Sequence, residues 1–101
     1  MYVSRLTFHT IPGKTGEAET ALRKLQEMVS GAGGAKPRIL HTHFASLGAP
    51  DIVFEQEVED LAAFEVEVRK LTNNKGFQSW SKKMSALLRE SPKRELYLLA
   101  E

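Results

Sequence analysis

Hydrophobic and polar residues alternate along four stretches of the chain, and alternation with a period of two is typical of β-strands. The first stretch is 2–11, with the sequence YVSRLTFHTI, and the next two are 37–47 and 52–58. The last is 94–101, RELYLLAE. Turn-forming residues at 48–51 separate the second stretch from the third, which predicts that these two strands form an antiparallel hairpin.

Three other stretches place hydrophobic residues three and four positions apart, which is the spacing of one buried helix face. The first predicted helix runs from Thr15 to Ser30, and the glycine-rich stretch 31–34 ends it. Asp60 is expected to cap a second helix that continues to about Leu71. A third helix carries five apolar residues in helical phase: Phe77, Trp80, Met84, Leu87 and Leu88.

The predicted order of elements is therefore β-α-β-β-α-α-β, which indicates an α+β protein. With right-handed crossovers, this order gives a ferredoxin-like four-stranded antiparallel sheet with the helices on one face. A length of 101 residues fits one domain, and neither a linker nor an internal repeat divides the chain. We therefore expect a single domain over 1–101.

Helices on one face leave the other face of the sheet bare. The set expected to point toward the helices is apolar: Leu6, Phe8, Leu40, Phe44, Ile52 and Phe54. The set expected on the bare face mixes apolar and ionisable side chains: Val3, Arg5, Thr7, His9, Ile39, His41, His43, Val53, Glu55, Glu57 and Tyr97. Such a mixed face favours packing against a second copy, so we expect a homodimer in which two sheets form an α/β barrel around a partly polar cavity.

Composition and charge argue against several classes of function. The 14 basic and 13 acidic residues give a net charge of +1 without a basic stripe, which argues against nucleic-acid binding. The absence of cysteine excludes a disulfide scaffold, an Fe–S cluster and a thiol nucleophile. No apolar run reaches the roughly 20 residues of a membrane span, and the first residues lack the pattern of a signal peptide. A cytoplasmic protein without a membrane partner is the simplest expectation.

The pattern as a whole resembles the dimeric α/β-barrel superfamily. The residues that carry the likeness form an aromatic helix and the strand after it: Gly76-Phe77-Gln78-Ser79-Trp80, Met84, Leu88 and Arg94-Glu95-Leu96-Tyr97. The nearest likeness is to small bacterial NIPSNAP-like and antibiotic-biosynthesis-monooxygenase-like proteins. The superfamily also contains isomerases of the muconolactone type and haem-degrading enzymes, and one fold hosts many functions. The absence of any histidine after His43 argues against haem ligation by the helical segment.

Three histidines are the candidate general bases, because histidine titrates near neutral pH: His41, His43 and His9. His41 and His43 would share a strand face, with Arg5 holding a substrate anion. Together with a carboxylate such as Glu55, the three rings could also bind Zn²⁺, but His9 and His41 lie on strands that do not adjoin in the predicted sheet. We therefore predict no metal site. A structural ion-pair network on the same face is the alternative interpretation.

Six side chains are candidates for contacting a ligand: Arg5, Thr7, Glu55, Tyr97, Trp80 and Phe77. The first four belong to the predicted bare face. Phe77 and Trp80 lie at helical spacing, for which a place in the core is the simpler interpretation and a ligand wall is the alternative.

Two classes of function fit these features. One is a cofactor-independent monooxygenase or isomerase that acts on a small apolar organic molecule, with a histidine as general base and no cofactor. The other is a non-catalytic ligand-binding or interaction module of the NIPSNAP-like type. The substitutions His41→Ala and His43→Ala separate the two, because only an enzyme would lose turnover while its dimer stays folded.

Overall fold

The computed structural model describes residues 1–31 and 36–100, and its elements follow the predicted order. The strands are β1 (Tyr2–Phe8), β2 (Arg38–His41), β3 (Ile52–Val58) and β4 (Lys93–Leu98). The helices are α1 (Thr15–Gly31), α2 (Leu61–Thr72) and α3 (Lys75–Ser85). Most of the glycine-rich stretch predicted to end the first helix lies outside the described residues, as does Glu101 at the end of the last predicted strand.

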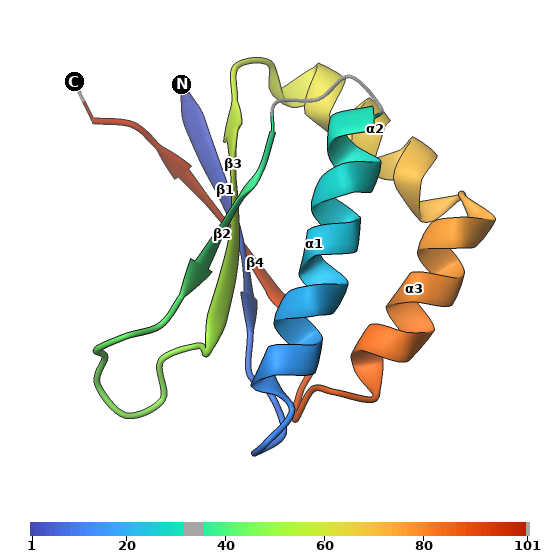
Figure 1. Ribbon diagram of the computed structural model, residues 1–101. Coiled ribbons are helices and arrows are strands. Elements are labelled where there is room, and N and C mark those ends of the chain that lie inside the picture. The colour runs from blue at the N-terminus through green and yellow to red at the C-terminus, as the bar shows by residue number, and fades with distance from the viewer. Residues whose placement is uncertain (32–35, 101) are drawn as a thin grey trace.

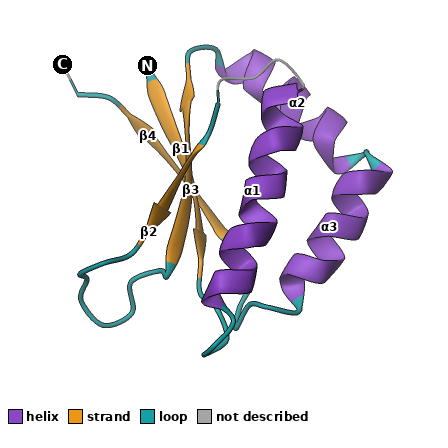
Figure 2. Ribbon diagram, in the orientation of Figure 1, coloured by secondary structure: helices purple, strands orange, loops and turns teal. Residues whose placement is uncertain are grey.

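The four strands form one antiparallel sheet with the order β2-β3-β1-β4. Figure 1 shows α1, α2 and α3 together on one side of this sheet, and Figure 2 shows the same two layers by element type. Among the described residues, no element covers the opposite side of the sheet. The predicted α+β, ferredoxin-like fold is confirmed. We call the two sides of the sheet the helix face and the open face.

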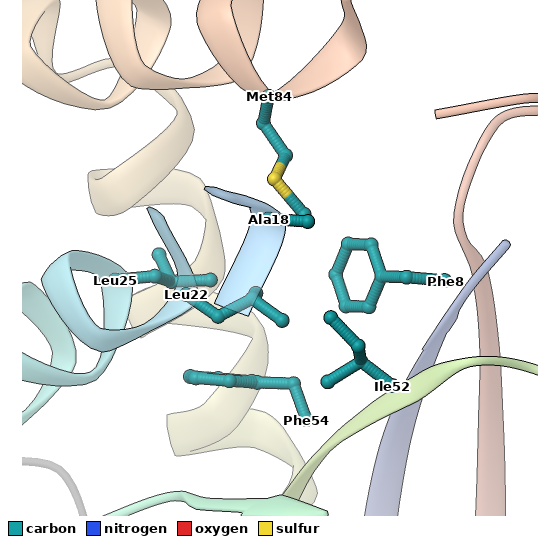
Figure 3. Close-up of a cluster of buried hydrophobic side chains, with 7 residues drawn as sticks. All are labelled: Phe8, Ala18, Leu22, Leu25, Ile52, Phe54 and Met84. Atoms are coloured by element: carbon teal, nitrogen blue, oxygen red, sulfur yellow. The ribbon is translucent and has the colours of Figure 1, made fainter. Parts of the chain in front are cut away.

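The hydrophobic core lies between α1, α3 and the two central strands (Figure 3). Seven buried side chains form it: Phe8, Ala18, Leu22, Leu25, Ile52, Phe54 and Met84. Burial of each large apolar side chain of this kind contributes about 1.5–3 kcal/mol. Phe8, Ile52 and Phe54 are among the side chains that their strand periodicity predicted to point inward.

Side chains at the helix N-termini explain why α2 and α3 begin where they do. Asp60 accepts hydrogen bonds from the backbone N–H groups of Ala62 and Ala63, at 3.0 and 3.3 Å, which confirms it as the cap of α2. Asn74 accepts the equivalent bonds from Gly76 and Phe77, at 2.7 and 3.2 Å. The Asn74 side chain therefore fixes the start of α3 shortly after α2 ends.

The predicted orientation of the second strand is wrong. Ile39 pairs with Phe54 and His41 pairs with Ile52, so both lie on the helix face, whereas Leu40 pairs with Val53 on the open face. A shift of one residue in register reverses every side chain of a strand, and local alternation cannot detect it. Here Ile39 packs against the buried core, which selects the observed register.

The second strand is also shorter than predicted. It ends at His41, after which the Thr42 N–H donates to the Asp51 carbonyl and the Thr42 hydroxyl donates to the Pro50 carbonyl, at 2.6 Å. The predicted inward residue Phe44 therefore lies in a loop and is 92% exposed, and His43 is exposed in the same loop. The alternation in 42–47 belongs to the loop and does not extend the sheet.

None of the helices in the described part of the chain is both long and apolar enough to cross a membrane.

Candidate functional site

A pocket of about 290 Å³ opens between the helix face of the sheet and helices α2 and α3. We call it the helix–sheet pocket. Its walls are mainly apolar, and five aromatic side chains contribute to them: Phe8, Phe54, Phe64, Phe77 and Trp80. Aliphatic side chains from α1 and α2 complete the apolar surface: Leu25, Val29, Val68 and Leu71. A concave, largely apolar site with a few polar groups is the usual form of a small-molecule site.

Phe77 and Trp80 were predicted to lie either in the core or in the wall of a ligand pocket, and each side chain does both. Both side chains are half-buried, pack against the core cluster and line the helix–sheet pocket. Their ring centroids lie 5.5 Å apart with planes tilted by 31°. The indole N–H of Trp80 donates to the Ala21 carbonyl of α1 at 2.7 Å, which ties α3 to α1. Since this bond satisfies the polar atom of the indole, its aromatic surface is what remains for the pocket.

The polar groups of the pocket include Ser4, Gln56 and Arg94 from the sheet. Arg94 pairs with Leu6 across β1 and β4, which places it on the helix face. One guanidinium N–H donates to the Ser4 hydroxyl at 2.6 Å, and the guanidinium carbon lies 5.2 Å from the centre of the Phe64 ring. Burial lowers the pKa of Arg94 from its usual value, and an arginine in this condition still carries its charge at neutral pH.

Sequence reasoning missed Arg94 as a site residue. The missed signal is its phase, because Arg94 is two and four residues before Leu96 and Leu98 and shares their side of the strand. When a basic residue lies on the same side of a strand as apolar residues, its charge is directed toward the side of the sheet that the helices cover. The prediction instead took the outward residues of that strand, including Tyr97, as the functional ones.

Four predicted ligand-binding residues lie on the open face. Glu55 is only 3% exposed and binds Arg5 at 2.7 Å and also Arg38. Burial raises the pKa of Glu55, but the hydrogen bonds from Arg5 and Arg38 outweigh burial and hold the pKa below its usual value. The Arg5 guanidinium lies 5.4 Å from the Tyr97 ring, and the Thr7 hydroxyl reaches the Lys93 carbonyl at 3.4 Å.

This cluster of Arg5, Arg38, Glu55 and Tyr97, which we call the open-face ion cluster, has the form of a structural ion-pair network. Its buried carboxylate is already occupied by two guanidinium groups. The structure thus brings Arg5, Glu55 and Tyr97 together as predicted, but separates them from Phe77 and Trp80 by the thickness of the sheet.

The structure places the three candidate general bases in three separate environments. The His9 ring lies between two acceptors, with Nδ1 2.8 Å from a Glu90 carboxylate oxygen and Nε2 3.1 Å from the Gly48 carbonyl. His41 is exposed at the sheet edge, where Nδ1 lies 3.0 Å from a Glu19 carboxylate oxygen. None of the three histidines lines the helix–sheet pocket.

His43 makes an edge-to-face contact with the exposed ring of Phe44, with centroids 5.1 Å apart. Within residues 1–31 and 36–100, no group of three histidine or acidic side chains is arranged to hold a metal ion. The general-base role of the histidines stays a prediction, and the helix–sheet pocket does not depend on it.

Comparison with solved structures finds the same fold in full-length alignments. An uncharacterised NIPSNAP domain protein from Burkholderia xenovorans shares 16% identity over 99% of this chain and 95% of its own, with a TM-score of 0.77. A protein described as an antibiotic biosynthesis monooxygenase shares 16% identity over 100% of both chains, with a TM-score of 0.70. A NIPSNAP family protein from Agrobacterium tumefaciens shares 16% identity over 99% of this chain and 93% of its own, with a TM-score of 0.71.

No protein-family model matches the sequence, and no curated protein matches it. The resemblance expected from the sequence is thus confirmed in the fold, which these structures share with the chain.

Proposed function

We propose that this chain, with a fold shared by monooxygenases and NIPSNAP proteins, binds a small, largely apolar organic molecule in the helix–sheet pocket. The observation that carries the proposal is the composition of the pocket, in which aromatic and aliphatic walls surround a smaller number of polar groups from the sheet and the helices. The volume of about 290 Å³ lies just below the usual range of small-molecule sites, roughly 300–1,000 Å³. This size suits a ligand of one or two rings.

A second candidate is that the bound molecule is also oxidised or isomerised there without a cofactor. The full-length likeness to an antibiotic biosynthesis monooxygenase favours it. In such an oxidation, a ring CH₂ group would become a carbonyl, one atom of O₂ would enter the product, and the other would leave as water. The non-catalytic alternative is a ligand-binding module of the NIPSNAP-like type, favoured by the likeness to NIPSNAP proteins.

We further propose that the protein works as a homodimer. Exposed apolar side chains on β2 and β4 and just after β4 support this proposal: Leu40, Leu96, Tyr97, Leu98 and Leu99. Leu40 and Tyr97 lie on the open face, which a second sheet would cover. The expectation that the protein is cytoplasmic stays a prediction from the sequence.

The single tryptophan makes the pocket directly observable. Trp80 is the only tryptophan in the chain and lines the helix–sheet pocket, so its fluorescence reports on whatever enters. We would titrate the protein with 2-naphthoate and follow Trp80 emission, with native mass spectrometry to count bound molecules per chain. Saturable quenching with one molecule per chain is the expected result.

A matched pair of variants on α2 tests whether binding occurs in the pocket. Val68 lines the pocket, whereas Val66 is 48% exposed on the same helix. Val68→Phe would fill the pocket and is expected to weaken binding strongly, while Val66→Phe would leave it unchanged. Equal affinity in the two variants, or no saturable binding by the unaltered protein, would reject the proposed function. Oxygen uptake with product mass spectrometry then separates the enzyme from the binding module.

A further inference from the structure

We infer that the ligand of the helix–sheet pocket carries an anionic oxygen group, such as a carboxylate, phenolate or enolate, which the Arg94 guanidinium binds. This inference rests on the proposed function, because it specifies the chemistry of the molecule that the same pocket accepts. Its basis is the difference between Arg94 and two other arginines of the sheet, Arg5 and Arg38.

Arg94 is held in place by contacts that leave most of its hydrogen-bonding capacity unused. A guanidinium has five N–H donors in a planar fork. One of them donates to the Ser4 hydroxyl, which is itself 2% exposed, and the Phe64 ring lies beside the group. These contacts set the direction of the guanidinium toward the pocket. The remaining donors suit the planar, two-oxygen shape of a carboxylate.

Among the residues that the structure describes, the charge of Arg94 has no counter-ion. In the part of the chain that the structure describes, Arg5 and Arg38 both pair with Glu55, but no carboxylate pairs with Arg94. Burial lowers the pKa of Arg94, and no ion pair with a described carboxylate offsets that effect. Part of the Arg94 side chain stays exposed to solvent and part is covered, so its charge is partly desolvated without an ion pair to offset the cost. An anionic ligand would supply the compensation that the protein omits.

Glu67 is the one acidic side chain in the described lining of the pocket, so it is the protein group that could take the place of an anionic ligand at Arg94. It comes from α2, opposite the sheet, and forms no ion pair with Arg94. If Glu67 moved to Arg94 in the absence of ligand, it would compete with an anion for the guanidinium. Glu67→Gln would then tighten anion binding, and it would leave the preference for an anion over a neutral compound intact.

The test compares two compounds of nearly the same shape, 2-naphthoate and 2-naphthamide, which differ in charge. Both are titrated at pH 7 against Trp80 fluorescence. We expect 2-naphthoate to bind about tenfold more tightly or better, since a hydrogen bond between charged groups contributes that much. Arg94→Met should abolish the preference and Arg94→Lys should retain part of it.

Lys93→Met is the matched control. Lys93 is the neighbour of Arg94 on β4, and its pairing with Thr7 places it on the open face, so the variant removes the same charge outside the pocket. It should leave the preference for 2-naphthoate unchanged. Circular dichroism of each variant confirms that the fold is kept.

Each outcome decides a specific point. Equal affinity for the two compounds in the unaltered protein would overturn the inference and leave the proposed function standing. A preference that survives in a folded Arg94→Met variant, or disappears in Lys93→Met, would also overturn it. Failure of both compounds to bind would instead count against the proposed function. If Arg94→Met does not fold, the unaltered protein and Arg94→Lys still decide the question. A preference for 2-naphthoate that becomes smaller in Arg94→Lys supports the inference, and a preference that stays the same overturns it.

Discussion

The two faces of the sheet use arginine in opposite ways. On the open face, Arg5 and Arg38 converge on one buried carboxylate, Glu55, and the three groups form a closed set of ion pairs. On the helix face, Arg94 projects into an apolar pocket and bonds to a neutral hydroxyl. The same residue type is thus neutralised within the protein on one face and left uncompensated on the other. This difference separates the structural role of Arg5 and Arg38 from the binding role proposed for Arg94 better than the number of ionisable groups does.

That comparison also bears on the predicted site, because its ligand-binding candidates Arg5, Thr7, Glu55 and Tyr97 lie on the open face. In the sequence, strand alternation places many ionisable residues on the open face, which favours that face as the predicted site. Once folded, its central acid is saturated by its own neighbours, so little of its chemistry is available. The helix face has few ionisable residues, and the proposed binding role belongs to Arg94, which forms no ion pair with a described carboxylate.

The largest expected effect contrasts two phenylalanines that were both predicted to point inward. Phe8 is 1% exposed in the core, and Phe44 is 92% exposed in the loop. Phe8→Ala should lower the free energy of unfolding by about 3–5 kcal/mol, whereas Phe44→Ala should change it by less than about 0.5 kcal/mol. Urea denaturation followed by Trp80 fluorescence measures both. A concentration-dependent loss in the Phe44 variant would instead show that the loop is buried in a dimer.

The next effect tests the open-face ion cluster. Glu55→Gln should lower the free energy of unfolding by about 1–3 kcal/mol at pH 7, because it removes charged hydrogen bonds to two arginines that are partly exposed to solvent. Binding of 2-naphthoate should not change, because Glu55 lies on the other side of the sheet from the pocket. Loss of binding in a folded Glu55→Gln variant would contradict the division of roles between the two faces.

The same variant predicts a pH dependence of stability. The pKa of Glu55 lies below its usual value in the folded state, so its stabilisation is fully present above the unfolded-state pKa of about 4.3. It is lost as the pH falls through the lower folded-state pKa. The stability difference between the unaltered protein and Glu55→Gln should therefore shrink in acid. A difference that stays constant from pH 7 to pH 3 would be inconsistent with this mechanism.

A smaller effect concerns the helix that carries the pocket aromatics. Asn74→Ala removes the side chain that caps α3 and should lower the free energy of unfolding by about 1 kcal/mol. Phe77 and Trp80 lie in the first two turns of α3, so loss of the cap would loosen the pocket wall that they form. Binding of 2-naphthoate should therefore also weaken. Asn73→Ala is the control, because Asn73 ends α2 through its backbone N–H. Equal effects of the two variants on binding would argue that the Asn74 cap does not support the pocket.

The smallest effect concerns the exposed edge of the sheet. His41 is the main cause that lowers the pKa of Glu19, through the hydrogen bond between them. His41→Ala should therefore raise the pKa of the Glu19 carboxyl, as measured by NMR titration, and change stability by less than about 0.5 kcal/mol. Ligand binding in the pocket should be unaffected. A loss of catalytic turnover in this variant would support the predicted general-base role of His41.

The sequence by itself determined the features that depend on local interactions. Periods of two and of 3.6 residues identified the strands and helices in their correct order, and Asp60 marked the start of α2 through a contact within one turn. The inward positions of Phe8, Ile52 and Phe54 followed from alternation within strands that adjoin the core. Such signals lie within a few residues of each other, so a single stretch of chain contains them.

Only the tertiary structure decided the orientation of β2 and the identity of the pocket cation. Register depends on pairing between distant strands, and a shift of one residue exchanged the faces of Leu40 and His41. The bond that directs Arg94 joins residues 90 positions apart in the chain. Whether a charge is neutralised or left for a ligand depends on which distant side chains fold beside it, and no local pattern records that.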